Sequence, residues 1–143
     1  MKTPVLNRVA AKMIDILFVF ALAVVLPYPL GPLAGFGYSL VADGMHVKPF
    51  RGQSLGKLIM RLRVVSTLEP RPASLRDSII RNAPVGVATF FAIIPVWGWL
   101  ILGLIGLPLM VIEVYLMTTV ANGHRLGDVM GDTEVVGVPR KAK

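Results

Sequence analysis

Two carboxylates, Asp15 and Glu113, stand within long apolar stretches of the sequence, where charged residues are rare. An ionisable side chain inside a membrane helix is costly, and it usually faces a partner, water or an ion pathway. Both residues are predicted to lie at a similar depth below one membrane surface. Two carboxylates at one depth could share a proton or bind a cation, which is the chemistry of a cation/proton exchanger.

A structural role is the alternative, and it is the one that we favour. Both carboxylates lie near the predicted interface, where burial costs less than at the centre of a bilayer. Each one also has cations within reach along the chain or across a possible repeat. These cations are Lys12, Arg8 and Arg81 for Asp15, and Arg125 for Glu113.

Other kinds of site find little support in the sequence. Cysteine is absent, which excludes disulfides, thiolate catalysis and cysteine metal sites. The sequence also lacks a glycine-rich phosphate loop and a nucleophile paired with a base. We therefore expect a protein that is not an enzyme and that has neither a cofactor nor a metal site.

The composition indicates a membrane environment for these carboxylates. The 143 residues are 55% hydrophobic and 16% charged, and the formal net charge is +7. Ordinary soluble domains carry roughly 25% charged residues, and a chain this short has too small an interior to bury so much apolar surface. Lipid is the natural surrounding for the excess.

The placement of the cations predicts the topology. Lysine and arginine fall in three blocks, at residues 2–12, 48–81 and 125–143, and the stretches between them contain none. Cationic residues concentrate in short cytoplasmic loops, so all three blocks should lie on the cytoplasmic side. Each intervening stretch must then cross the membrane an even number of times. We expect an all-α integral membrane protein with two helical hairpins and both termini cytoplasmic.

The hairpins predict one membrane domain over residues 1–143, with a cytoplasmic loop at 48–78 and a cytoplasmic tail at 120–143. The second helix is short, so it must tilt or thin the bilayer if it crosses, and a re-entrant segment is the alternative. The four transmembrane helices are expected at about residues 9–26, 33–46, 79–95 and 99–119.

A weak internal repeat runs through the sequence. Residues 55–65 resemble residues 126–136 at an offset of 71, and Arg81 stands in the second half where Arg8 stands in the first. Two-helix repeats would have parallel topology. Lys57 occupies the position of Asp128, so these two could pair, although both could equally be solvated. The valine segments that follow could form a two-stranded ribbon.

The central loop is basic and amphipathic, which is typical of a segment that lies in the membrane interface. Its cations favour contact with anionic lipid headgroups. Nucleic acid is not expected as a partner, because the loop lacks aromatic residues on which bases could stack. The lipid-contacting cations are expected to be Lys48, Arg51, Lys57, Arg61 and Arg63.

Three segments carry a family resemblance: "NRVAAKMIDILF" from residue 7, "GQSLGKLIMRLRVVS" from residue 52 and "HRLGDVMGDTEVV" from residue 124. They resemble the signature segments of the RDD family of bacterial multi-pass membrane proteins. The arginine and two aspartates that name the family match Arg8, Asp15 and Asp128. The short second helix, which follows a proline-rich stretch, departs from the family pattern.

The resemblance implies a small multi-pass protein of the bacterial inner membrane without enzyme activity. Some family members are associated with cation/proton exchange, and others look like accessory or assembly subunits. We expect an accessory or assembly subunit of a larger membrane complex. The alternative is a homo-oligomeric cation/proton exchanger that uses Asp15 and Glu113. The expected partners are anionic lipids and other membrane subunits, or further copies of the chain.

Overall fold

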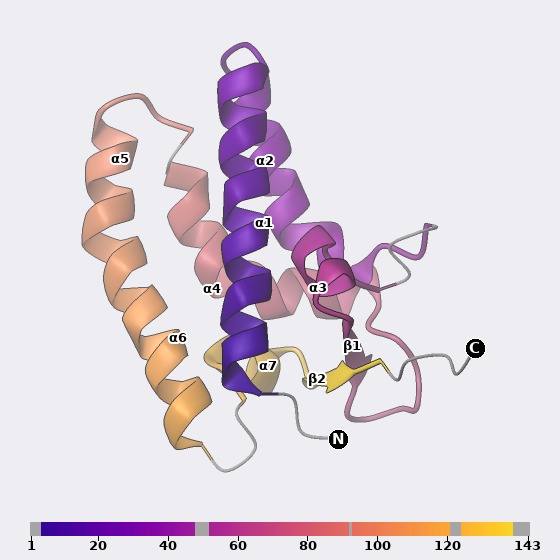
Figure 1. Cartoon of the computed structure of the whole chain (residues 1–143). Coiled ribbons are helices and arrows are strands. Elements are labelled where there is room, and N and C mark those ends of the chain that lie inside the picture. The colour runs from indigo at the N-terminus through magenta and orange to yellow at the C-terminus, as the bar shows by residue number, and fades with distance from the viewer. Residues whose placement is uncertain (1–3, 48–51, 92, 121–123, 139–143) are drawn as a thin grey trace.

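A computed structural model describes most of the chain, and in this part it is mostly helical (Figure 1). Long helices form two hairpins, and two short helix–strand units gather near one end of them. The hairpin turns lie at the opposite end (Figure 1). The described residues are 4–47, 52–91, 93–120 and 124–138.

The first hairpin joins α1 (Val5–Val25) to α2 (Leu30–Val41). The helix α1 begins four residues before the expected start at residue 9. The helix α2 has 12 residues, or about 18 Å at 1.5 Å per residue, and ends in a 3-10 turn, η1 (Ala42–Gly44). The two helices approach closely because α2 contributes Gly31, where a Cβ atom would collide with the backbone of α1. Compared with the predicted 33–46, α2 begins three residues earlier and ends five residues earlier.

The second hairpin begins with α4 (Leu75–Phe91). After a turn, the chain continues through α5 (Trp97–Ile101), the π-helical segment η2 (Leu102–Gly106) and α6 (Leu107–Thr119). These last three form one helical segment of 23 residues that is long and apolar enough to cross a membrane. Only 11% of it is buried within the chain, so most of its apolar surface faces outward.

A capping box starts α4, as its sequence suggests. The backbone N–H of Asp77 donates to Ser74 Oγ at 3.2 Å, and the backbone N–H of Ser74 donates to Asp77 Oδ2 at 2.9 Å. These reciprocal bonds satisfy amides that a helix N-terminus leaves unpaired. The helix therefore begins directly after the prolines of the central segment.

Two short helix–strand units follow the hairpins. The first consists of α3 (Leu55–Ile59) and β1 (Leu62–Ser66), and the second consists of α7 (Leu126–Met130) and β2 (Thr133–Gly137). The two strands pair antiparallel as a ribbon, with Leu62 opposite Gly137 and Ser66 opposite Thr133. Every bound of the second unit lies 71 residues after the matching bound of the first.

Both units turn from helix to strand in the same way. Arg61 has φ 55° and Asp132 has φ 46°, and these two residues are also 71 apart. Left-handed backbone is uncommon for residues other than glycine. The two units therefore share a local conformation that few sequences adopt.

The interior near the ribbon is unusually polar. Its apolar core is small and consists of Ala11, Leu62 and Val135, with Met60 packed against it. Many charged and polar side chains are buried nearby, whereas large apolar side chains cover the outside of the long helices. This distribution suits a protein surrounded by lipid, since lipid leaves apolar surface uncovered without penalty.

Candidate functional site: a buried network of charged residues

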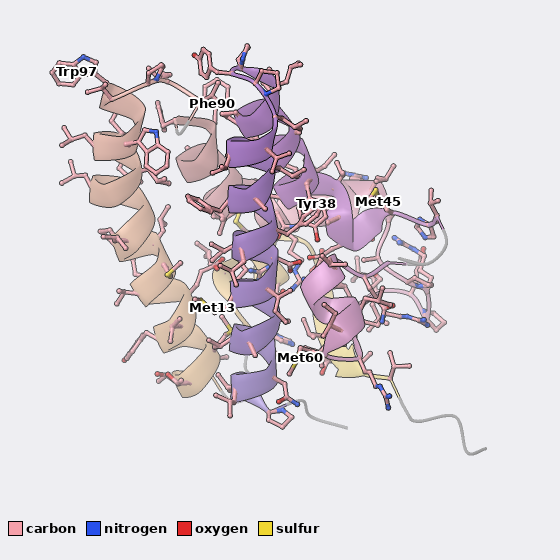
Figure 2. All side chains as sticks on the ribbon, turned by 45° about the horizontal axis from the view of Figure 1, so that its top comes forward. Met13, Tyr38, Met45, Met60, Phe90 and Trp97 are labelled. Atoms are coloured by element: carbon pink, nitrogen blue, oxygen red, sulfur yellow. The ribbon has the colours of Figure 1, made fainter. Side chains whose placement is uncertain are left out.

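Asp15 joins the first hairpin to α3. Its carboxylate accepts hydrogen bonds from Tyr38 Oη at 2.9 Å, Ser54 Oγ at 2.6 Å and the backbone N–H of Gly56 at 2.8 Å. Tyr38 Oη in turn accepts from the backbone N–H of Leu55 at 2.8 Å, which places this side chain between α2 and α3 (Figure 2). Both carboxylate oxygens are thus occupied by donors from the protein.

The close approach of α3 to α1 depends on a missing side chain. A Cβ atom on Gly56 would collide with the backbone carbonyl oxygen of Ala11. Gly127 has the same relation to the second hairpin, because its Cβ atom would collide with the carbonyl oxygen of Arg81. Each short helix is thus pressed against the backbone of a long one.

Asp43, at the end of α2, forms the second centre of the network. Lys57 Nζ donates to its Oδ1 at 2.5 Å, and Asn82 Nδ2 and Arg81 Nε lie 3.5 and 3.9 Å from its Oδ2. Burial alone would raise the pKa of this carboxyl, but the charges of Lys57 and Arg81 outweigh it and hold the pKa below its usual range. Asp43 therefore stays ionised and ties α2, α3 and α4 together.

Lys57 is a cation of this group whose charged form is disfavoured by burial. Burial lowers the pKa of its ammonium to about 8, with Asp43 opposing the shift and the nearby charges of Arg81 and Arg125 adding to it. A lysine with one carboxylate partner and two arginine neighbours binds its proton weakly. Its charge state therefore changes close to the physiological pH range.

Asp128, in α7, is the third centre and collects cations from three helices. Arg8 Nη2 of α1 lies 2.6 Å from its Oδ2, while Arg81 Nε of α4 and Arg125 Nε at the start of α7 lie 2.9 and 3.5 Å from its Oδ1. Burial would raise the pKa of this carboxyl, but Arg81, Arg125 and Arg8 lower it below its usual range. Asp128 is thus a permanent anion that joins the start of the described chain to its end.

Arg125 extends the network to α6. Its Nη1 lies 3.4 Å from Glu113 Oε2, and its Nη2 donates to Asn82 Oδ1 at 3.0 Å. Burial opposes its charge, but Asp128 and Glu113 raise the pKa of its guanidinium above the ordinary value. The contacts run without interruption from Lys57 through Asp43, Asn82 and Arg125 to the last long helix.

Some of the expected contacts occur and others are replaced. Glu113 meets Arg125, as expected. Arg81, which was considered as a partner of Asp15, lies beside Asp128 instead. The possible pairing of Lys57 with Asp128 and the solvated alternative are both corrected by the structure, because the short turn after α2 brings Asp43 to this lysine instead. The partners of Asp15 are Tyr38, Ser54 and Gly56 rather than the cations considered from the sequence.

Asp43 and Asn82 were not predicted as site residues from the sequence. Asp43 had a usable signal, because it is a carboxylate at the end of a predicted apolar helix, as unexpected there as Asp15. Asn82 had a weaker signal, because it follows Arg81 in "RDSIIRNAP", which resembles the family's arginine–asparagine segment before the second hairpin. No three His, Cys, Asp or Glu side chains are grouped to hold a metal ion within the described ranges.

The cations expected at lipid headgroups fall into different environments. Lys57 is committed to Asp43, with only 13% of its side chain exposed. Arg61 is exposed at the turn after α3, and Arg63 is partly buried on β1. The remaining two, Lys48 and Arg51, lie outside the described residues.

The fold and its buried network define a small helical protein with a helix suited to crossing a membrane. The chain belongs to the RDD family, whose members are membrane proteins, because the family model matches residues 32–132. Asp128 lies within the matched residues, while Arg8 and Asp15 precede them. Comparison with curated proteins and with solved structures finds no match.

Proposed function

We propose that this protein is a non-enzymatic accessory or assembly subunit of a membrane complex in the bacterial inner membrane. The observation that carries the proposal is the division of the molecule into a closed polar interior and an open apolar exterior. Asp15, Asp43, Glu113 and Asp128 each contact donors or cations of the same chain. The helix Trp97–Thr119, by contrast, presents most of its surface to the surroundings.

The proposed topology has four crossings with both termini cytoplasmic. Its support comes from the way α1 distributes its residues. Asp15 is buried, whereas Leu17, Phe20 and Val24 on the outer side are exposed. A helix with inward polar residues and outward apolar ones suits a lipid-facing position in a bundle. The short α2 is proposed to cross with help from local thinning of the bilayer.

An internal repeat is proposed as the plan of the fold. The bounds of both helix–strand units, their left-handed turn residues and the glycines that press on long helices all recur at an offset of 71. The ribbon register is symmetric about the pair of Val64 and Val135, which are also 71 apart. These coincidences support two copies related by an axis along the membrane normal.

Single-cysteine labelling tests the topology, because the chain has no cysteine of its own. Cysteines replacing Leu30 or Trp97 should react with an impermeant maleimide added outside intact cells. A cysteine replacing Glu69 should react only after the cells are opened. Labelling of the Glu69 position from outside would overturn the topology.

Site-specific photocrosslinking tests the accessory role. A photoreactive residue at Leu104 or Val111, both exposed, should crosslink to another membrane protein that also co-purifies in mild detergent. The same probe at Met117, which is buried on the same helix, should not. Crosslinks to lipid alone from the exposed positions would contradict the proposal.

The alternative function, cation/proton exchange, requires that the purified chain transport cations without a partner. In proteoliposomes such an exchanger would take up cations when a pH gradient is imposed. Asp15→Asn or Glu113→Gln would then abolish that flux while leaving insertion normal. We expect no such flux. We also expect both substitutions to reduce the amount of folded protein, because each removes a partner from the buried network. A stable homodimer with pH-driven flux would overturn the accessory role.

A further inference from the structure

The helix α7 has its polar side inside and its apolar side outside. Gly127 and Asp128 are buried against α4 and the arginines, whereas Val129 and Met130 are 63% and 49% exposed. Leu126 at its start is exposed as well. A cytoplasmic helix would turn its charged residue to water and its apolar residues to the protein. The arrangement of α7 is the reverse.

The outer side of α1 gives the thickness of the apolar surroundings. Leu6 and Val25 are 77% and 78% exposed, and exposed apolar side chains continue between them. These 19 steps correspond to about 28 Å of helix, which matches the roughly 30 Å hydrocarbon core of a bilayer. Hydrocarbon must therefore extend down to the level of Leu6 if both ends of this apolar side are to be covered.

The helix α7 lies at that same level. Arg8 stands two residues after Leu6, about 3 Å along the helix axis, and its Nη2 lies 2.6 Å from Asp128 Oδ2 of α7. The matching helix α3 is also level with the first turns of α1, since Gly56 presses on Ala11. It too exposes an apolar residue, Ile59, with 58% of its surface open.

We propose that α7 and α3 are immersed in the cytoplasmic leaflet of the bilayer, where acyl chains cover their exposed sides. The inference rests on the proposed membrane topology and moves the C-terminal unit from the expected cytoplasmic tail into the membrane. Lipid covers the exposed side of α7 in this proposal because that side lies at the same height as Leu6 of α1, which faces lipid in the proposed topology. Arg61, which follows α3, and Arg76, in the first turn of α4, are exposed and can meet headgroup phosphates.

Immersion also accounts for the pairing of the buried carboxylates Asp15, Asp43 and Asp128 with groups of the same chain. If the bilayer reaches Leu6, the hydrocarbon core also surrounds the level of the buried carboxylates Asp15, Asp43 and Asp128. Apolar side chains then separate these carboxylates from the lipid. Polar groups at that depth have no water to bind and must be satisfied by the protein. The short helices α3 and α7 supply those partners from inside the membrane.

Nitroxide accessibility in vesicles tests the immersion directly. Single cysteines replacing Val129, Met130 or Ile59 in the full chain are spin-labelled and reconstituted into phosphatidylethanolamine–phosphatidylglycerol vesicles. The collision rates of each label with oxygen and with a water-soluble nickel chelate are then compared. Leu104, on the candidate membrane helix, is the control for lipid, and Glu69 is the control for water.

The expected result is an oxygen-dominated signal at Val129, Met130 and Ile59, with the same sign as at Leu104 and opposite to that at Glu69. A nickel-dominated signal at these positions, with Leu104 still oxygen-dominated, would overturn the immersion while leaving the membrane topology intact. Low accessibility to both reagents would also overturn it, since protein would then cover the helices. A nickel-dominated signal at Leu104 would instead contradict the membrane proposal.

Discussion

Replacing Asp128 by asparagine removes one negative charge from the position where three arginines meet. Arg8, Arg81 and Arg125 keep their charges but lose their common partner, which the structure places 2.6, 2.9 and 3.5 Å from them. Removing one member of a buried ion pair typically costs about 3–5 kcal/mol, because the remaining charge is left buried without compensation. The neutral amide also places a donor group where only an acceptor fits.

The effect is measured by thermal unfolding in detergent, followed by the fluorescence of the two tryptophans. At about 3 °C per kcal/mol for a chain of this size, Asp128→Asn should lower Tm by roughly 10–15 °C. Glu69→Gln is the matched control, since Glu69 pairs with Arg71 at 2.5 Å but has 65% of its side chain exposed. Exposed pairs contribute about 0–1 kcal/mol. Equal shifts in the two variants would refute the idea that the buried network holds the fold together.

Three further predictions concern other parts of the network and the ribbon. Because the pKa of Lys57 is about 8 in the folded chain against 10.5 for an ordinary lysine, the unfolded chain binds more protons between these values. The free energy of unfolding should therefore rise with pH across this window by up to about 1.4 kcal/mol per pH unit, and Lys57→Arg should reduce the rise in a pH series of denaturant titrations. Gly127→Ala should reduce the yield of folded protein, because its Cβ atom collides with backbone, whereas Gly103→Ala meets no atom within 4 Å and should be tolerated in the same size-exclusion assay. Cysteines replacing Val65 and Glu134, which face each other in the ribbon, should form a disulfide on mild oxidation, visible as a mobility shift on non-reducing gels; absence of the bond would contradict the register.

Patterns that depend on local chemistry could be predicted from the sequence. Residue types and spacing predict three features: the capping box of Ser74 and Asp77, the turn of the first hairpin at its prolines, and the apolar helix from Trp97. The family resemblance was confirmed as well. Each of these features depends on residues close together in the chain, so a reading along the sequence contains the necessary information.

The centres of the network could not be predicted in the same way. Asp43 meets Lys57 because α2 ends early and the 3-10 turn that follows it packs against α4. The sequence offers two candidate anions for that lysine, and their formal charges are identical. The anion that pairs with Lys57 is decided by how closely the short helices approach the long ones. Gly56 and Gly127 set this distance, so the pairing depends on backbone packing rather than on charge.

The bond between Arg8 and Asp128 joins residues 120 positions apart. During synthesis at about 5–20 residues per second, Arg8 is made roughly 6–24 s before its carboxylate partner. For that time the first helix carries a buried cation that its final partner does not yet neutralise. Closure of the fold is thus timed by the last segment of the chain. A ribosome that stalls before residue 128 would leave a first hairpin whose Arg8 has not met this carboxylate, and incomplete copies would differ from finished ones in that bond.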